Sequence, residues 1–235
     1  MENKIIAHMR TDFPGKFGIP RQSAVVSGLK GKIVFEKEYR REEMLRGLEG
    51  FSHLWVLWIF SENPEEKGES KWSPTVRPPR LGGNERVGVF ASRSPFRPNP
   101  IGLSAVRIVK LDMESADGPV IYVEGADMVD GTPIIDIKPY VAFTDSIPKA
   151  VSGFVDDVEY EKLPVSFSEA AEKCFEQLPE DIKENLKGIL ENDPRPHYRK
   201  DSDRVYRFEY AGYHIGFTVE NGKLKVCSLE PDSKC

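Results

Sequence analysis

The stretch Val87 to Ser104, VGVFASRSPFRPNPIGLS, places a proline-rich and basic break between two apolar segments. Its first residues are typical of a β-strand, and an apolar strand resumes after Gly102. Pro95, Pro98 and Pro100 exclude a regular ladder between the two, because proline lacks an N–H and fixes φ. Rigid loops between strands often carry binding residues, so the stretch predicts a binding loop within a β fold.

Short strand candidates recur on both sides of this loop, and only one short helix, Arg41 to Leu48, is expected among them. The His53 to Phe60 segment is so apolar that it predicts a central strand buried on both faces. The other candidates are Lys4 to Met9, Ser23 to Leu29, Gly31 to Tyr39, Arg86 to Ala91, Gly102 to Leu111, Pro119 to Ala126 and Pro133 to Lys138. No glycine-rich turn opens a helix after a strand, so the pattern favours a mainly β, mixed or antiparallel closed barrel over a doubly wound fold.

The composition changes after Asp145, where an acidic, irregular segment leads to two helix candidates and three strand candidates. The helices are expected at Ser168 to Gln177 and Pro179 to Glu191, and Asn221-Gly222 is a strong hairpin signal between two of the strands. We therefore predict two domains, a β-barrel at residues 1–160 and a small α+β domain at residues 161–235.

The composition is that of a globular protein, with 39% hydrophobic residues among 235 and a formal net charge of -5. No run is apolar enough for a membrane span or a signal peptide, which predicts a cytoplasmic protein. The odd number of cysteines, without paired metal-ligand spacing, supports neither a disulfide framework nor a metal site.

Basic residues concentrate between Lys71 and Arg107, a segment that contains seven basic residues and a single acidic residue, Glu85. Guanidinium groups are planar and always charged, so this segment predicts a localised anionic ligand, with an ordinary solvated loop as the alternative. Arg93 is the first candidate for a clamp on a carboxylate or phosphate. Arg97 either binds as well or bridges the loop internally.

Asp136, Lys138 and Tyr140 alternate with apolar residues and are therefore expected on one face of an extended segment. They form either an acid/base cluster or an ion pair beside a structural tyrosine. Further on, Arg195 to Lys200 mixes charge with stacking surface, which suits RNA, although Asp201 and Asp203 dilute it. Motifs for a serine hydrolase, a zinc protease or a P-loop kinase are absent from the sequence.

Five segments together make the sequence resemble the TrmO (TsaA-like, YaeB-like) family of tRNA methyltransferases. They are IPRQ from Ile19, RPPRLGG from Arg77, GVFASRSPFRPNPIGLS from Gly88, DGTPIIDIKPY from Asp130 and DPRPHYR from Asp193. The resemblance implies a non-Rossmann β-barrel that binds S-adenosylmethionine (SAM), works as a homodimer and uses its C-terminal domain for tRNA. The implied reaction is N6-methylation of threonylcarbamoyl-adenosine at position 37, beside the anticodon.

The resemblance also implies the positions of the site residues. The expected SAM contacts are Pro20, Arg21, Gln22, Phe60, Ser61, Arg93, Leu103, Asp130, Gly131, Thr132 and Pro133. Ser61 stands where relatives are expected to carry a bulkier polar residue, so a backbone contact is expected there. Asp136 and Tyr140 are candidate proton acceptors for catalysis. The expected RNA contacts are Arg97, Arg195, Tyr198, Arg199 and Lys200.

Two other functions remain open from the sequence. The barrel could bind RNA or an adenosyl ligand without catalysing a reaction, or the chain could be a hydrolase on an unfamiliar fold. Binding of SAM would distinguish a methyltransferase or a binding module from a hydrolase. Transfer of a labelled methyl group to tRNA would then distinguish the methyltransferase from the binding module.

Overall fold

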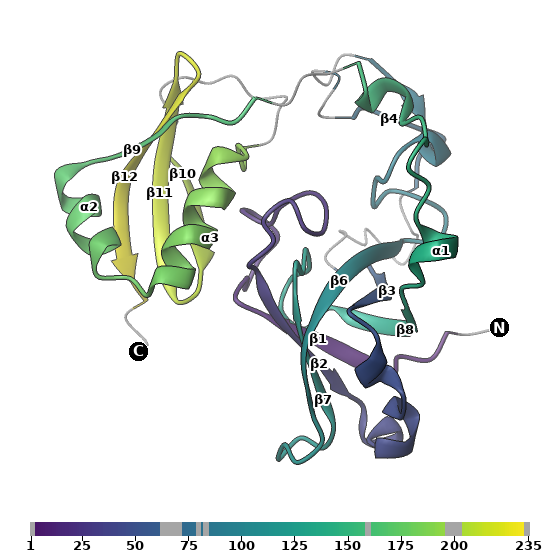
Figure 1. Ribbon diagram of the computed structural model, residues 1–235. Coiled ribbons are helices and arrows are strands. Elements are labelled where there is room, and N and C mark those ends of the chain that lie inside the picture. Colours follow the sequence, from purple (N-terminus) through teal and green to yellow (C-terminus); the bar gives the residue numbers. More distant parts are fainter. Residues whose placement is uncertain are drawn as a thin grey trace.

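The computed structural model describes residues 3–61, 72–78, 81, 85–157, 161–195 and 204–232. Six strands form a closed barrel in the order β1-β2-β7-β6-β3-β8, and every neighbouring pair in it with a described register is antiparallel (Figure 1). The strands are β1 (Ala7–Thr11), β2 (Lys30–Phe35), β3 (His53–Ile59), β6 (Ile101–Asp112), β7 (Val120–Glu124) and β8 (Pro133–Pro139). The predicted mainly β fold with a closed barrel is confirmed.

The barrel closes around side chains that alternate along its strands. In β3, Leu54, Val56 and Trp58 are buried, whereas the residues between them are only partly buried. The prediction that this strand is buried on both faces is therefore wrong. In a small closed barrel one face of each strand fills the interior and the other faces outward, so period-two alternation replaces two-sided burial.

After η1 (Lys37–Tyr39), the segment predicted as a helix at Arg41 to Leu48 forms the 3-10 turn η2 (Glu42–Leu45) and the start of η3 (Leu48–Gly50) instead. Gly47 has φ 89° and interrupts any continuous helix. The packing needs only one buried residue from η2, Leu45, so a full amphipathic helix has no apolar face to cover here.

The basic segment carries little regular structure. A two-stranded ribbon pairs β4 (Thr75–Val76) with β5 (Val87–Gly88), and η5 (Val89–Ala91) follows. The strand predicted at Arg86 to Ala91 is thus only two residues long, because the turn at η5 ends it. After the barrel come α1 (Ala142–Asp145) and η6 (Gly153–Val155).

The C-terminal part is a four-stranded sheet in the order β10-β11-β12-β9 with two helices packed against it (Figure 1). Its strands are β9 (Val165–Phe167), β10 (Tyr206–Tyr210), β11 (Tyr213–Glu220) and β12 (Lys223–Pro231), and its helices are α2 (Glu169–Glu176) and α3 (Glu180–Glu191). Ser168 caps α2 by accepting a hydrogen bond from the Ala171 N–H at 3.3 Å. Asn221 and Gly222 both have positive φ, as a tight hairpin turn requires.

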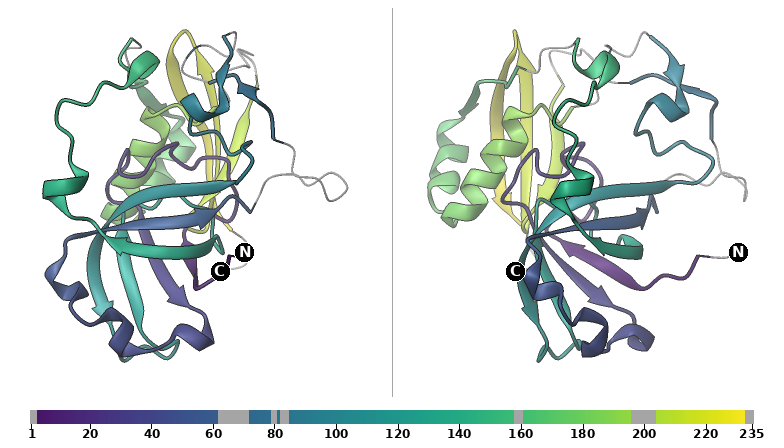
Figure 2. Two further views of the ribbon diagram at one scale, coloured as in Figure 1. Left: turned by 90° about the vertical axis from the view of Figure 1, so that its right-hand side faces the viewer. Right: turned by 45° about the vertical axis from the view of Figure 1, so that its right-hand side comes forward.

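The loop between β1 and β2, residues 12–29, joins the two parts. Phe13, Val26 and Leu29 lie in the core of the C-terminal sheet and not in the barrel core. The three views place this loop between barrel and sheet (Figures 1 and 2). The strand predicted at Ser23 to Leu29 is wrong for this reason: its apolar residues are used to anchor a loop, and Ala24 takes a positive φ of 62°.

Candidate functional site

Two of the predicted binding segments meet through Arg93 and Gln22, which are 71 residues apart in the chain. Arg93 lies in the proline-rich loop after η5, and its Nη1 donates a hydrogen bond to Oε1 of Gln22 in the loop 12–29. Arg93 is exposed, while Gln22 is partly buried. The contact holds a charged guanidinium at the surface in a defined orientation, which is what recognition of an anion requires.

The proline-rich loop is held by its own side chains as well as by its prolines. Ser92 Oγ donates to the Val89 carbonyl at 2.9 Å and accepts from the Ser94 N–H at 3.3 Å. Arg97 Nη1 donates to the Ser92 carbonyl at 3.1 Å. Arg97 is therefore engaged within the loop, as one of its two predicted roles required, and its RNA contact stays a prediction.

Asp127, just after β7, lies beside this pair and was not singled out by the sequence. Its Oδ1 accepts a hydrogen bond from Ser104 Oγ at 2.6 Å, and Ser104 Oγ accepts one from Trp58 Nε1 at 3.0 Å. Burial raises the pKa of Asp127 to about 6, although hydrogen bonds from Ser104 and the Ser23 N–H and the charge of Arg93 act in the opposite direction. A carboxylate thus sits where three distant segments converge.

A sequence signal for Asp127 existed but was weak. It is an acid between two residues, Ala126 and Met128, that are each 1% exposed. An acid next to two buried apolar residues at a strand end is unusual, and such groups are candidates for a functional site. The pattern of the strand alone does not say what the carboxylate contacts, since its partners come from residues 23, 93 and 104.

The predicted turn from Asp130 to Pro133 is anchored on β1. The Asp130 N–H donates to the Phe13 carbonyl and the Gly131 N–H to the Met9 carbonyl, both at 2.8 Å. Asp130 also accepts from the Thr11 N–H at 3.0 Å and pairs with Arg10 at 3.2 Å. The turn therefore borders the start of the loop 12–29, and Gln22 lies further along the same loop.

Phe60 packs beside Trp58 of the Ser104 network, whereas Leu103 lies on the other face of β6. The Phe60 ring lies 4.3 Å from that of Trp58, and its N–H donates to the Pro100 carbonyl at 2.9 Å. Leu103 precedes Ser104 on β6 and points to the opposite face, where 55% of it is exposed. Ser61 is exposed at the end of β3. In the first predicted segment, Pro20 is buried and Arg21 is exposed.

Asp136 and Tyr140 lie on the outside of the barrel. Asp136 forms an ion pair with Lys138 at 2.7 Å, and it sits beside Leu57, which is in turn opposite Leu103. The Tyr140 ring centroid lies 5.4 Å from that of Trp55. These contacts are those of the ion pair beside a structural tyrosine, and a catalytic role for either residue stays a prediction.

The C-terminal RNA candidates lie only partly within the described residues. Arg195 forms a two-pronged ion pair with Asp193, with Nε to Oδ1 at 2.8 Å and Nη2 to Oδ2 at 2.9 Å. Its carbonyl accepts from Arg21 Nη2 at 2.9 Å, which ties the Arg195 loop to the loop 12–29. Tyr198, Arg199 and Lys200 lie outside the described residues.

The described residues contain neither a metal-binding cluster nor a membrane-spanning helix. No group of three or more His, Cys, Asp or Glu side chains among them is placed to hold a metal ion. None of the helices described is both long and apolar enough to cross a membrane. Cys174 and Cys227 are free thiols.

Comparisons with known proteins cover almost the whole chain. The model described as the tRNA-methyltransferase O N-terminal domain matches residues 8–146, and that of the TrmO C-terminal domain matches residues 160–232. The chain is 37% identical over 231 residues to the tRNA (adenine(37)-N6)-methyltransferase of Escherichia coli K12, with 96% of each chain covered. It is 38% identical over 199 residues to a putative S-adenosylmethionine-dependent methyltransferase, RcsF, of Pseudomonas aeruginosa, with 83% of this chain and 82% of the relative covered. A crystal structure of TrmO from P. aeruginosa superimposes with a TM-score of 0.75 at 28% identity, over 98% of this chain and 97% of that one.

Proposed function

Because the chain belongs to the TrmO family of tRNA methyltransferases, we propose that it transfers the methyl group of SAM to N6 of the adenosine at position 37 of tRNA. The family relationship supports the reaction and the position. We further propose that the adenosine already carries a threonylcarbamoyl group. A tRNA substrate also points to the cytoplasm as the place of action.

The observation that carries the proposal is the meeting of Arg93 and Gln22 beside the Asp127 carboxylate. Arg93 and Gln22 belong to two segments that the sequence resemblance marked for SAM, and their contact supports a shared site. The barrel provides the rigid frame, since Ser104 of β6 and Trp58 of β3 hold Asp127 from inside.

The residues present fit SAM, which has a carboxylate, an ammonium, a sulfonium and an adenosine. The Arg93 guanidinium can pair with the SAM carboxylate. Exposed Leu103 offers apolar surface for an adenine ring. The residues that we propose to hold SAM are Pro20, Arg21, Gln22, Phe60, Ser61, Arg93, Leu103, Asp130, Gly131, Thr132 and Pro133.

When bound, SAM supplies an electrophilic methyl group on a sulfonium. Transfer to an amine needs alignment more than covalent assistance, so the main work of the chain is to orient two reactants. The loops can do this because Arg93, Arg97 and Ser92 fix the proline-rich segment, while Gln22 couples it to the loop 12–29.

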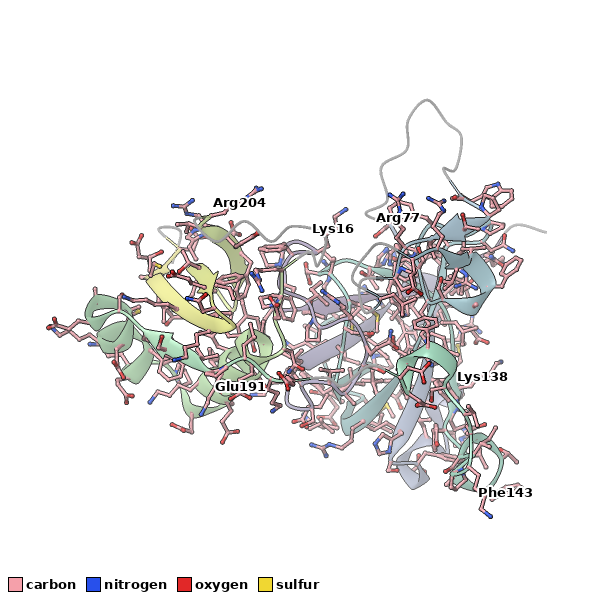
Figure 3. The ribbon with its side chains drawn as sticks, turned by 90° about the horizontal axis from the view of Figure 1, so that it is seen from above. Lys16, Arg77, Lys138, Phe143, Glu191 and Arg204 are labelled. Carbon is pink, nitrogen blue, oxygen red and sulfur yellow. The ribbon has the colours of Figure 1, made fainter. Side chains whose placement is uncertain are left out.

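The RNA surface that we propose includes Arg97, Arg195, Tyr198, Arg199 and Lys200. Other basic side chains could extend this surface: seen from above, Lys16 stands between Arg77 and Arg204 along one edge of the molecule (Figure 3). Such a line of positive charge suits a phosphate backbone. Position 37 lies in a loop of tRNA, where a base can be splayed out at low cost.

We also propose that the protein works as a homodimer. Phe143, Ile147 and Val151 are apolar, yet they are 88%, 70% and 87% exposed. Phe143 lies at the outer end of the molecule (Figure 3). Exposed apolar side chains close together in sequence are typical of a surface that another chain covers.

The test of the proposed function has two stages. Calorimetry with SAM should give a binding heat that is strongly reduced in Arg93→Ala. Incubation with methyl-labelled SAM should then place label on tRNA and not on a double-stranded RNA without a loop. SAM binding without label on threonylcarbamoylated tRNA would leave a binding module and overturn the enzyme.

A further inference from the structure

The proposed reaction leaves a proton to be removed. The N6 nitrogen carries a hydrogen before methylation, and a neutral product forms only if this hydrogen leaves as a proton. Water can accept it, but a positioned base with a pKa near the working pH accelerates such steps by about a hundredfold to ten thousandfold. The chain should therefore place a carboxylate or an imidazole beside the reacting amine.

Asp127 is placed for this task by its contacts. It stands next to the segments of Gln22 and Arg93, and its Oδ1 accepts from Ser104 at 2.6 Å. The residue is partly exposed, although both its neighbours in sequence are buried. Its hydrogen bond from Ser104, which is only 1% exposed, fixes the carboxylate, so the side chain needs little rearrangement to accept a proton.

We propose that Asp127 is the catalytic base that takes the N6 proton during methyl transfer, an inference that rests on the proposed function. The N6 lone pair forms the new bond to the methyl carbon as the carbon–sulfur bond breaks with its electrons passing to sulfur. The N6–H bond then leaves its electron pair on nitrogen, and the proton goes to the Asp127 carboxylate. Charge balances, since a cation and a carboxylate give a neutral thioether and a carboxylic acid.

The electrostatics of Asp127 agree with this role. Burial raises its pKa to about 6, and the groups that act against burial are the Ser104 hydroxyl, the Ser23 N–H and the charge of Arg93. At neutral pH the side chain is therefore ionised and still basic enough to accept a proton. A surface aspartate with an ordinary pKa would be a much weaker base.

The other carboxylate candidate has a different setting. Asp136 is paired with Lys138 at 2.7 Å, and 45% of its side chain is exposed on the outside of the barrel. A base in such an ion pair gives up a favourable contact on accepting a proton. Tyr140 packs beside Trp55 and would have to be ionised first to act as a base.

The experiment compares Asp127→Asn with the wild type, because asparagine keeps the shape and a hydrogen-bond acceptor for Ser104. We expect the single-turnover rate at saturating SAM to fall at least about a hundredfold, with the Kd for SAM, measured by calorimetry, within about threefold of the wild type. Asp117→Asn, in the exposed turn before β7, is the matched control and should keep the wild-type rate. A single-turnover rate within tenfold of the wild type would overturn the proposal that Asp127 is the base. Weaker SAM binding together with a wild-type rate at saturating SAM would overturn it as well.

A second variant tests the same inference through pH. Ser104→Ala removes the hydroxyl that favours the ionised carboxylate, so the pKa of Asp127 should rise and the acid limb of the rate profile should move to higher pH. An unmoved limb would contradict the role of Asp127, and a limb that stays in place in Ser104→Ala but is lost in Asp136→Asn would transfer the role to Asp136. Failure of the wild type itself to methylate tRNA is a separate result that removes the proposed function.

Discussion

Arg93 shows how far a single residue can be foreseen. Its charge and its rigid, proline-bounded setting marked it in the sequence, and the structure adds its partner, Gln22. That pairing could not be predicted from spacing, because the two loops are brought together only when the barrel closes. Asp127 is the opposite case, since nothing in its own segment reveals the partners that hold it.

Replacing Arg93 by alanine should weaken SAM binding by roughly tenfold to a hundredfold, because a hydrogen bond to a charged group contributes about 1.5–3 kcal/mol. Thermal stability should change little, as the side chain is exposed. Calorimetry with SAM measures the first effect and a melting curve the second. The matched control is Arg107→Ala, which removes an exposed arginine paired with Glu124 on β6 and β7. Equal affinities for SAM in the two variants would exclude the Arg93 clamp.

The unusual pKa of Asp127 has a consequence for stability. An acid whose pKa is raised in the folded state holds its proton more tightly there, so its contribution to stability is present below pH 3.8 and is lost as pH rises through about 6. Asp127→Asn removes this loss and should raise the free energy of unfolding at pH 8 by about 3 kcal/mol, with no gain at pH 3.5. Urea unfolding at the two pH values measures the difference. A variant that is less stable at pH 8 would show that the ionised carboxylate stabilises the fold.

The loop 12–29 is the element that sequence patterns describe least well. Its prolines and glycines indicated a loop up to Gln22, but the strand expected from Ser23 onward is absent because Val26 and Leu29 anchor the loop in the C-terminal core. The bounds of β3 and β6 were predicted to within one residue, although the burial of β3 on both faces was not confirmed. An apolar run bound for a distant core looks the same in sequence as a strand, and only the tertiary structure distinguishes them.

Gly18 tests whether this loop must keep its shape. Its φ is 98°, and a Cβ added there would lie 2.4 Å from Cδ2 of Phe208 in β10. Gly18→Ala should therefore destabilise the protein by about 2–3 kcal/mol and weaken SAM binding, since the strained loop carries Pro20 to Gln22. Melting temperature and calorimetry report the two effects. Gly15→Ala is the matched control, because a Cβ there meets nothing within 4 Å. If Gly18→Ala is destabilised but binds SAM with unchanged affinity, the shape of the loop 12–29 does not determine SAM binding.

At the scale of the molecule, several contacts hold the barrel and the C-terminal sheet together. Lys30 pairs with Asp181 of α3 at 2.5 Å, and Asn185 Nδ2 donates to the Gly28 carbonyl at 3.0 Å. The division of the chain into a β part and an α+β part followed from the change of composition. The contacts between the two parts could not be predicted in the same way. They depend on the loop 12–29, which connects two barrel strands but packs in the core of the C-terminal part.

The proposed homodimer predicts that a charge in the exposed apolar segment separates the protomers. Phe143→Asp should shift the sedimentation coefficient from that of a dimer to that of a monomer, since burying an unpaired carboxylate in an interface is costly. Met44→Asp, in η2 of the barrel, replaces another exposed apolar residue and should leave the dimer intact. A wild type that sediments as a monomer would exclude the dimer, and an unaffected Phe143→Asp would exclude this interface.

Methylation of N6 at position 37 can be detected by nucleoside mass spectrometry. The protein and SAM are incubated with one tRNA transcript in two forms, with and without threonylcarbamoyl on adenosine 37, and each tRNA is digested to nucleosides. We expect a mass gain of one methyl group on the threonylcarbamoyl-adenosine alone. Threonylcarbamoyl-adenosine of unchanged mass in the presence of bound SAM, or a methyl group on any other nucleoside, would contradict it.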